Sequence, residues 1–326
     1  MPDPPTRRRV LDPDLLGVAA FMVVLGVLAG FRALEIDPYS RPAYDLWAYW
    51  LSRGGLEYGV AHPGDTGAYL YSPAFAQAIA SLTALPWPWF AAVWTVLAAL
   101  PLLWLAGRWS LPLLLVPPVF LSVLLGQLDL AFAAVAVLAV RWPAVWALPI
   151  LTKATPGVGL VWYVARREWR NLGIALGVTG AIALASAVLA PGAWAGWLGL
   201  LFRMDFPELD HRLIFLPIPL WVRLIAVIVL VAWGARRDRL WVLPVGMLLS
   251  LPTVWIQSPA ILVALLPLAA AGARTPAAAW LRGAAPTAAP TPDAGAGEPA
   301  PRAAPRPHRR PLGWLRLLRL RVRRIA

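Results

Sequence analysis

Apolar residues fill long runs of this chain, and polar residues gather in short clusters between them. One run, at 74–86, is shorter than a bilayer crossing. Runs near the length of a crossing occur at 15–34, 88–107, 110–125, 128–140, 143–165, 171–189, 214–233, 240–256 and 258–271. Because a helix of about 20 apolar residues spans the hydrocarbon core, the pattern predicts an all-α, polytopic transmembrane protein with roughly eight to ten helices.

Prolines interrupt the middle of the chain and leave two topologies open. Counting every run as a full crossing puts Arg108 and Arg141 outside. Treating 74–86 and the two halves of 143–165 as partial or re-entrant helices keeps both arginines in the cytoplasm. The positive-inside rule favours this second arrangement, which brings "GQLD" and "TKATP" to the outer side.

The composition agrees with membrane insertion. The chain is 60% hydrophobic and 14% charged, and its mean hydropathy is +0.66. A soluble chain of 326 residues is less apolar than this. No small-residue cleavage site follows the run at 15–34, so we expect a retained helix in a multi-pass protein of the cell membrane.

The net charge of +13 indicates membrane orientation and not nucleic-acid binding. Basic clusters at 7–9, 166–170 and 235–239 flank the apolar runs, and nine arginines with no acid lie in 301–326. We therefore expect both termini in the cytoplasm and external loops at 35–73 and 190–213.

The same pattern predicts the division into domains. Residues 1–14 form a cytoplasmic N-terminus, 15–272 a transmembrane domain, and 273–326 a disordered Pro/Ala-rich tail. The tail ends in the basic amphipathic stretch "LGWLRLLRLRVRRIA", which is suited either to the anionic inner leaflet or to no specific role.

Several kinds of chemistry have no support in the sequence. The chain has no cysteine, which excludes disulfides and thiol catalysis, and its three histidines lie far apart, so we expect no metal site. It also lacks a phosphate-binding P-loop, HExxH and GxSxG.

The stretch "AYDLWAYWLSRGG" (43–55) places a carboxylate among aromatic residues. At helical spacing, Asp45, Tyr49 and Ser52 share one face with Arg53, and the opposite face carries Leu46, Trp47, Trp50 and Leu51. We expect a short helix ending at Gly54 and Gly55, with its tryptophans in the membrane interface and Asp45 turned toward water or a cavity. Asp45 is either a general base or an interfacial acid paired with Arg41 or Arg53.

Six of the seven tyrosines fall between residues 39 and 71. An aromatic belt would spread tyrosines over all the interfaces, so this clustering favours a surface that stacks on sugar rings. The six are Tyr39, Tyr44, Tyr49, Tyr58, Tyr69 and Tyr71.

Lys153 is the only lysine beside 28 arginines, and it lies within an apolar run. A buried ammonium needs an anionic partner, which an anionic lipid phosphate or the intramembrane carboxylate of Asp129 can supply. Gln127 is a further polar residue in apolar surroundings. The Gly-x-x-x-Gly spacing of Gly173 and Gly177 favours close helix packing.

Taken in order, these motifs resemble glycosyltransferase family 87, membrane enzymes of the GT-C type that use polyprenyl-phosphate mannose. The resemblance rests on "YDLWAY" (44–49), "YLYSPAF" (69–75), "GQLDL" (126–130) and "LTKATP" (151–156) followed by "RREWR". It covers about residues 15–271. Near 250–259 the family tends to carry two histidines, where this chain has Gln257 and Ser258.

The resemblance implies a role for each matching residue. Asp45 would be the catalytic base, and Lys153, Gln127, Tyr49 and Tyr71 would bind the donor phosphate and sugar. The candidates for acceptor or sugar contacts are Tyr44, Tyr69, Trp255, Gln257 and His211.

The function expected from the resemblance is inverting transfer of a hexose such as mannose. The donor would be a polyprenyl phosphate, the acceptor a lipid or glycan, and the reaction extracytoplasmic, without a cofactor or an obligatory metal. Two alternatives remain open: a transporter or flippase, and an inactive relative that binds a lipid-linked sugar.

Overall fold

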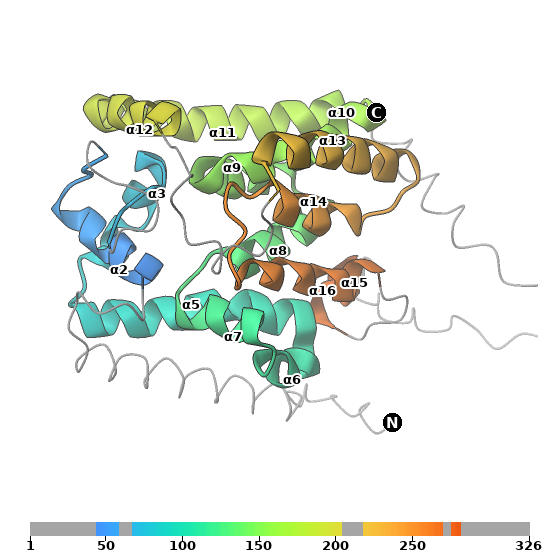
Figure 1. The fold of residues 1–326 in the computed structure, drawn as a ribbon, viewed down its shortest axis with the longest axis horizontal. Coiled ribbons are helices and arrows are strands. Elements are labelled where there is room, and N and C mark those ends of the chain that lie inside the picture. The colour runs from blue at the N-terminus through green and yellow to red at the C-terminus, as the bar shows by residue number, and fades with distance from the viewer. Residues whose placement is uncertain (1–43, 59–66, 204–217, 270–274, 282–326) are drawn as a thin grey trace, which may run out of the picture. The chain divides into compact units, whose positions relative to one another are not determined.

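The computed structural model describes residues 44–58, 67–203, 218–269 and 275–281. In these ranges every regular element is helical (Figure 1). The expected first span, the basic tail and His211 lie outside the described residues, as does most of the loop that follows α12.

The first half of the described chain contains mostly short helices. They are α2 (Tyr44–Leu51), η2 (Ser52–Gly54), α3 (Pro73–Ala78), α4 (Ala80–Thr83), α5 (Trp87–Ala106), η3 (Gly107–Trp109), α6 (Ser110–Leu114), α7 (Pro117–Leu124), α8 (Asp129–Leu138), η4 (Pro143–Trp146) and α9 (Ala147–Lys153). Proline occupies the first turn of several of them, where its missing N–H has no helical partner.

The second half contains both long and short helices. They are η5 (Thr155–Leu160), α10 (Val161–Arg166), α11 (Trp169–Leu189), α12 (Pro191–Arg203), α13 (Leu220–Arg236), α14 (Val242–Ser250), η6 (Ser258–Ala264), α15 (Leu265–Ala269) and α16 (Pro276–Leu281).

Two helices of the described chain are long and apolar enough to cross a membrane. One runs from Trp87 to Leu114 and the other is α11. A third crossing is counted if the bent pair α7–α8 is taken as one span. This is fewer than the eight to ten predicted, because prolines and turns divide the other apolar runs into helices shorter than a bilayer crossing.

The bend between α7 and α8 measures 105°. Gly126 lies in it with φ +69°, a left-handed conformation that costs glycine little. A Cβ atom at this position would lie 3.0 Å from side-chain carbons of Leu46 and Trp94, so glycine also allows α2 and α5 to approach the bend. The bend is therefore the point where three elements meet.

Contacts define one end of the helical domain, here called the carboxylate end: α2, α3, the start of α5, the end of α11, and α12. The Trp50 indole donates to the Leu85 carbonyl oxygen (2.9 Å), which holds α2 at the start of α5. The Gln77 amide donates to the Ser186 carbonyl oxygen (3.3 Å), which holds α3 at the end of α11.

The other end, here called the arginine end, comprises Arg108, Arg141, 166–170 and 236–239. Residues close in sequence to these arginines contact one another and bring the four segments together. Trp280 packs edge-on against Trp104 and Trp142, and the Tyr163 hydroxyl donates to the Ala139 carbonyl oxygen (2.6 Å). Arg166 donates to the Ala235 carbonyl oxygen (3.0 Å). Figure 1 shows α5 and α11 running between the two ends.

Arg108 and Arg141 therefore lie at the same end, although α6, α7 and α8 separate them in sequence. The chain leaves the arginine end after α5, reaches the bend at Gly126, and returns through α8. Both topologies predicted from the sequence place the two arginines on one side, so this arrangement agrees with either of them.

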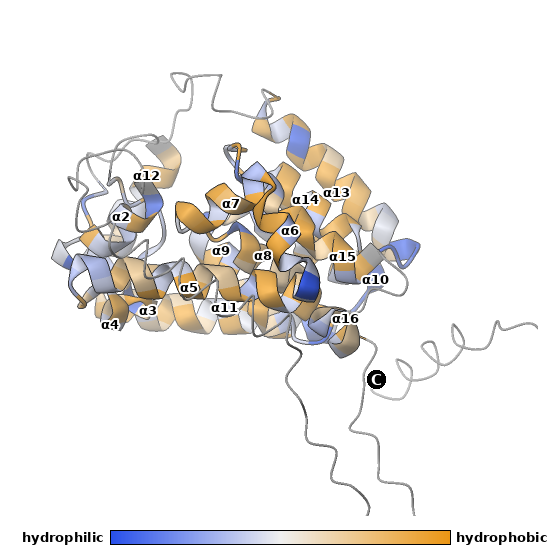
Figure 2. Cartoon of the chain, turned by 90° about the horizontal axis from the view of Figure 1, so that it is seen from below, coloured by the Kyte–Doolittle hydropathy of each residue, from blue (hydrophilic) through white to orange (hydrophobic). Residues whose placement is uncertain are grey.

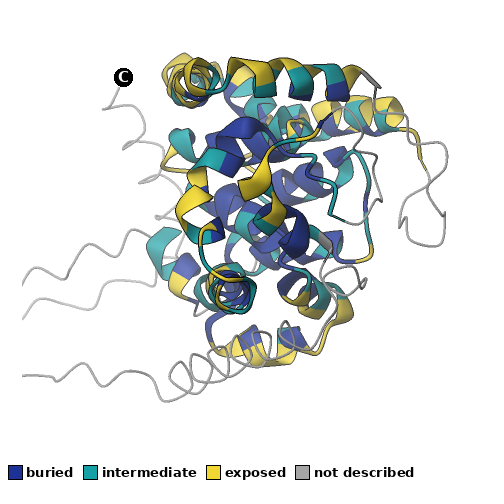
Figure 3. Ribbon diagram, turned by 90° about the vertical axis from the view of Figure 1, so that its left-hand side faces the viewer, coloured by how far each residue is buried: buried dark blue, intermediate teal, exposed yellow. Residues whose placement is uncertain are grey.

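The apolar surface is largest on α11 and α13. Leu184, Val188 and Leu189 on α11 are 67%, 74% and 76% exposed, and Trp221 and Val229 on α13 are more than half exposed. Figure 2 shows the apolar character of these helices, and Figure 3 shows exposed positions along the outer side of α11 and buried ones between the helices. Exposed apolar helix faces of this extent are typical of contact with lipid.

The structure departs from two predictions about local order. Residues 276–281, assigned to the disordered tail, form α16, because Trp280 fills the space between Trp104 and Trp142 and Arg141 donates to the Leu281 carbonyl oxygen (2.9 Å). Gly173 and Gly177 do not mediate close packing among the described residues, since a Cβ at either position would meet none of their atoms within 4 Å.

Candidate functional site

The helix α2 carries Asp45 in its first turn and ends where the sequence predicted, before Gly54 and Gly55. The predicted orientation of its tryptophans is wrong. Trp47 is buried and packs against Trp50 and edge-on against Trp87, 4.9 Å and 4.8 Å between ring centroids. Trp47 therefore packs α2 against the start of α5, while Trp50 is half-buried and Leu51 is 39% exposed.

Asp45 is held by hydrogen bonds from two other elements. The Tyr71 hydroxyl donates to Asp45 Oδ1 (3.0 Å), and the Gln127 side-chain amide donates to Asp45 Oδ2. Tyr49, one turn after Asp45 on α2, donates its hydroxyl proton to the Tyr71 hydroxyl oxygen (3.0 Å). Hydrogen-bond donors from the 67–72 segment and from the α7–α8 bend thus orient the carboxylate. Asp45 is half-buried.

The surroundings of Asp45 change its acidity. Burial raises the pKa of Asp45 above its ordinary value of 3.8, while the positive charge of Lys153 and the hydrogen bond from Tyr71 lower it. The negative charge of Asp129 raises it again. The net rise moves Asp45 toward the acidity of a general base.

Tyr49 and Tyr71 remain neutral phenols at physiological pH. Burial, and the neighbouring carboxylate of Asp45, raise the pKa of both hydroxyls well above 10.0. Neutral phenols can donate, so both hydroxyls can stabilise the charged form of Asp45 directly or through each other.

Lys153 and Asp129 form the ion pair that the sequence offered as one alternative. Lys153 Nζ lies 3.9 Å from Asp129 Oδ1, beyond hydrogen-bond distance. The Asp129 side chain is 1% exposed, and neither of its oxygens has a hydrogen-bond partner among the described residues. The Lys153 side chain is 16% exposed, so its ammonium is the accessible member of the pair.

No hydrogen bond of the Lys153 ammonium is found within the described ranges, although it has three N–H donors. The residue ends α9, and the next residue, Ala154, has the unusual φ of +50°. A partly buried cation with unused donors is suited to binding an anion.

The four described tyrosines of the 39–71 cluster pack against one another. Their exposures are 0%, 2%, 7% and 5% for Tyr49, Tyr58, Tyr69 and Tyr71. Their rings therefore do not form the exposed stacking surface that the sequence favoured. The packed rings instead support Tyr71, which binds Asp45. The Tyr58 hydroxyl donates to the Tyr71 carbonyl oxygen (2.7 Å).

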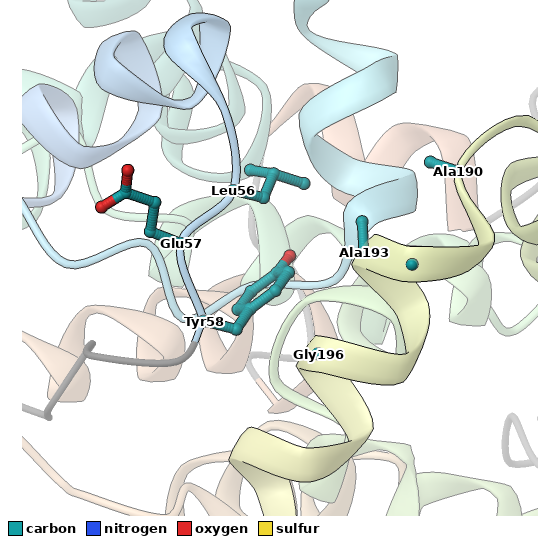
Figure 4. A pocket seen from close by; sticks show the side chains of 7 residues that line it. Leu56, Glu57, Tyr58, Ala190, Ala193 and Gly196 are labelled. Atoms are coloured by element: carbon teal, nitrogen blue, oxygen red, sulfur yellow. The ribbon is translucent and has the colours of Figure 1, made fainter.

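A pocket of about 610 Å³ lies on the other side of Tyr58, between the 56–58 segment and α12. Figure 4 shows the Tyr58 ring directed toward α12 and the Glu57 carboxylate directed away from it. Gly196 lets the ring approach, since a Cβ there would lie 3.3 Å from a ring carbon of Tyr58. Tyr58 thus separates this pocket from the Asp45 cluster.

The other candidate residues are not part of the cluster. Gln257 is buried and Trp255 half-buried in the loop before η6, and no described contact joins either to Asp45. His211 and the side chain of Tyr44 lie outside the described residues, and Tyr69 donates its hydroxyl proton to the Ser72 carbonyl oxygen (3.1 Å).

Sequence reasoning missed the role of Arg223 on α13. This buried guanidinium donates to the carbonyl oxygens of Ile218, Leu249, Leu251 and Pro252 at 2.7–2.9 Å, and so caps the end of α14. Its only sequence signal was a charged residue within an apolar run.

The cluster brings five predicted residues together: Asp45, Tyr49, Tyr71, Gln127 and Lys153. Their arrangement combines an oriented carboxylate that can accept a proton with an ammonium that can bind an anion. Among the described residues, no group of three or more acidic or histidine side chains is placed to hold a metal ion. No protein-family model, curated protein or solved structure matches the chain.

Proposed function

We propose that the chain is a polytopic membrane glycosyltransferase. It moves a hexose, such as mannose, from a polyprenyl phosphate to a hydroxyl of a lipid or glycan on the extracytoplasmic side. The observation that carries the proposal is a half-buried carboxylate, Asp45, that is oriented by Tyr71 and Gln127. The ammonium of Lys153, which makes no hydrogen bond among the described residues, acts electrostatically on this carboxylate.

The reaction requires one proton transfer and one bond exchange. The acceptor hydroxyl oxygen attacks the anomeric carbon, and the bond between that carbon and the phosphate oxygen breaks. The electron pair of this bond stays on the phosphate, and the acceptor proton passes to Asp45. Attack from the face opposite the phosphate inverts the anomeric configuration.

One carboxylate is sufficient for this chemistry. A departing sugar alkoxide needs protonation, which is why hydrolytic glycosidases use two carboxyl groups. A phosphate is already a stable anion, and Lys153 can neutralise part of the charge that develops on it. Gln127 and Tyr71 hold the base in place, and this positioning lowers the entropic cost of the attack.

The membrane arrangement follows from the two ends. In the proposal the arginine end faces the cytoplasm and the carboxylate end faces outward, as the positive-inside rule requires. In the proposal, two consecutive short helices together make one crossing. The chain can then have more crossings than the two or three long spans found among the described residues.

The base is tested by Asp45→Asn in membranes supplied with polyprenyl-phosphate mannose and an acceptor lipid extract. We expect transfer to fall at least a hundredfold while donor binding persists, because asparagine keeps the shape but cannot accept the proton. Glu57→Gln is the matched control, since its carboxylate is exposed and directed away from α12. Full transfer by Asp45→Asn would remove the assignment.

A transporter is the second candidate, because one observation favours it. The α7–α8 pair is broken by 105°, and a buried acid, Asp129, begins its second half. Discontinuous helices with a charged residue at the break are typical of transporter sites. Donor turnover separates the two: an enzyme consumes polyprenyl-phosphate mannose, whereas a transporter returns its solute unchanged.

A further inference from the structure

The arginine end combines two features that the proposed reaction does not use. Seven of its arginines are exposed: Arg108, Arg141, Arg167, Arg170, Arg236, Arg237 and Arg239. An eighth, Arg166, is half-buried and binds both acids of the region, Glu168 and Asp238. Within the described ranges, the seven exposed arginines therefore have no acidic partner.

Exposed tryptophans accompany these arginines. Trp109, Trp142 and Trp169 are 51%, 55% and 61% exposed, and each is next in sequence to an arginine. Trp233 is 45% exposed, within one turn of Arg236. The Arg108 guanidinium lies over the Trp109 ring, with 5.5 Å between its central carbon and the ring centroid.

The same pairing occurs around α16. Arg141 lies over the Trp280 ring at 4.7 Å and donates to the Leu281 carbonyl oxygen, and Trp142 packs edge-on against Trp280. Rings that flank a guanidinium keep it extended and leave its remaining N–H donors outward. Arg108 and Arg141 thus present fixed cations beside half-exposed indoles.

The carboxylate end has one such guanidinium–indole pair, where the arginine end has several. Its described exposed arginine is Arg53, which lies over Trp50, and its exposed Trp89 has no adjacent arginine. Unpaired cations and amphipathic rings are therefore concentrated at one end. Indoles favour the headgroup level of a bilayer, and guanidiniums bind phosphate with two parallel hydrogen bonds.

We infer that the arginine end is a binding surface for anionic phospholipid headgroups, with the indoles at the carbonyl level and the guanidiniums on the lipid phosphates. Charge complementarity selects this occupant, because anionic lipid attracts each basic residue near its surface by about 1 kcal/mol, or roughly fivefold in local lipid occupancy. The inference depends on membrane insertion but not on glycosyl transfer.

The chain contains no cysteine, so a single fluorescent reporter can be placed at either end. The reporter is bimane on Trp109→Cys at the arginine end and on Trp89→Cys at the carboxylate end, both half-exposed or more in the native chain. The full-length protein is reconstituted in phosphatidylcholine vesicles that contain brominated phosphatidylglycerol or brominated phosphatidylcholine, and quenching is compared at equal mole fraction.

At position 109 we expect brominated phosphatidylglycerol to bind several-fold more strongly than brominated phosphatidylcholine, and at position 89 about equally. Arg108→Gln should reduce the preference at position 109 by up to about fivefold. Arg108→Lys keeps the charge and should retain most of it. Salt at 0.5 M should also reduce the preference for phosphatidylglycerol in the reporter protein that keeps all its arginines. This measurement tests the inference even if the Arg108 variants fail to fold.

Equal quenching by the two lipids at position 109 overturns the inference, as does an equal preference at both positions. A reporter at 109 that responds to polyglutamate or to an oligonucleotide in pure phosphatidylcholine, and not to phosphatidylglycerol, assigns the surface to another partner. Failure to enter vesicles removes the membrane premise. If the protein prefers anionic lipid at position 109 but transfers no hexose, the proposed function is overturned and the lipid inference stands.

Discussion

Asp45 is a carboxylate whose two oxygens are each engaged by a different element, Tyr71 on one side and Gln127 on the other. Each oxygen keeps a second lone pair, so one more donor can be accepted. That donor is the acceptor hydroxyl in the proposed reaction. The acidity of Asp45 is set by opposing neighbours, Lys153 lowering its pKa and Asp129 raising it.

This opposition gives a prediction for the pH dependence of transfer. A general base works deprotonated, so activity rises with pH through the pKa of Asp45, whose value burial raises above 3.8. Lys153→Met removes a cation and should move the acid limb to higher pH. Asp129→Asn removes an anion and should move it to lower pH. The measurement is kcat/KM against pH at raised enzyme concentration.

The opposite signs make the test specific. Both variants remove one member of the same ion pair, so a purely structural effect would alter the rate without moving the limb in opposite directions. If the acid limbs of the two variants' pH profiles coincide with that of the native chain, Asp45 does not set the pH dependence of transfer.

At the scale of elements, the α7–α8 bend decides where Gln127 and Asp129 lie. Its geometry depends on Gly126, which has positive φ and lies against Leu46 of α2 and Trp94 of α5. The Trp94 indole donates to the Gly126 carbonyl oxygen (2.9 Å), so the bend is also fixed by a hydrogen bond.

Gly126→Ala should destabilise the chain by about 1–3 kcal/mol, since alanine is strained at positive φ and its methyl group overpacks the bend. Transfer should fall as well, because the Gln127 amide moves away from Asp45. Gly177→Ala is the matched control: a Cβ there meets nothing within 4 Å, and helix propensity favours alanine by up to about 1 kcal/mol. Thermal unfolding in detergent measures both.

A native unfolding midpoint for Gly126→Ala would show that the bend tolerates a side chain. Unchanged transfer despite lower stability would show that the bend does not position Gln127.

Hydrophobic runs predicted the positions of α5, α8, α11, α13 and α14, because burial of apolar residues follows sequence spacing directly. Tyr71 and Gln127 were predicted as sugar-donor contacts in separate motifs, but their hydrogen bonds to Asp45 were not predicted. The burial of Trp47 and of the tyrosines was not predicted either, since a periodic pattern cannot tell a lipid-facing ring from one covered by another helix. The folding of α16 depends on Trp104 and Trp142, which lie far away in sequence.

At the scale of the whole molecule, charge divides the described chain into two ends. The arginine end carries eight arginines and two acids, and the carboxylate end carries Asp45, Glu57 and Arg53. Lys153 and Asp129 form a pair of opposite charges. By the positive-inside rule this asymmetry favours a membrane orientation with the arginine end in the cytoplasm, which is the orientation that we propose.

Single cysteines introduced at 108, 141, 53 and 89 test this arrangement. In intact cells, a membrane-impermeant maleimide should label 53 and 89, and 108 and 141 should react only after the membrane is opened. Labelling of 108 and 141 in intact cells would place the arginine end outside and would contradict the proposed orientation.

The isolation of Lys153 has a practical consequence for chemical probing. It is the only side-chain amine in 326 residues, its ammonium is partly exposed, and no described hydrogen bond engages it. An amine-directed acylating reagent therefore has a single internal target, which lies inside the candidate site. The extent of acylation, read as one mass shift on one peptide, becomes a direct measure of how often the site is occupied.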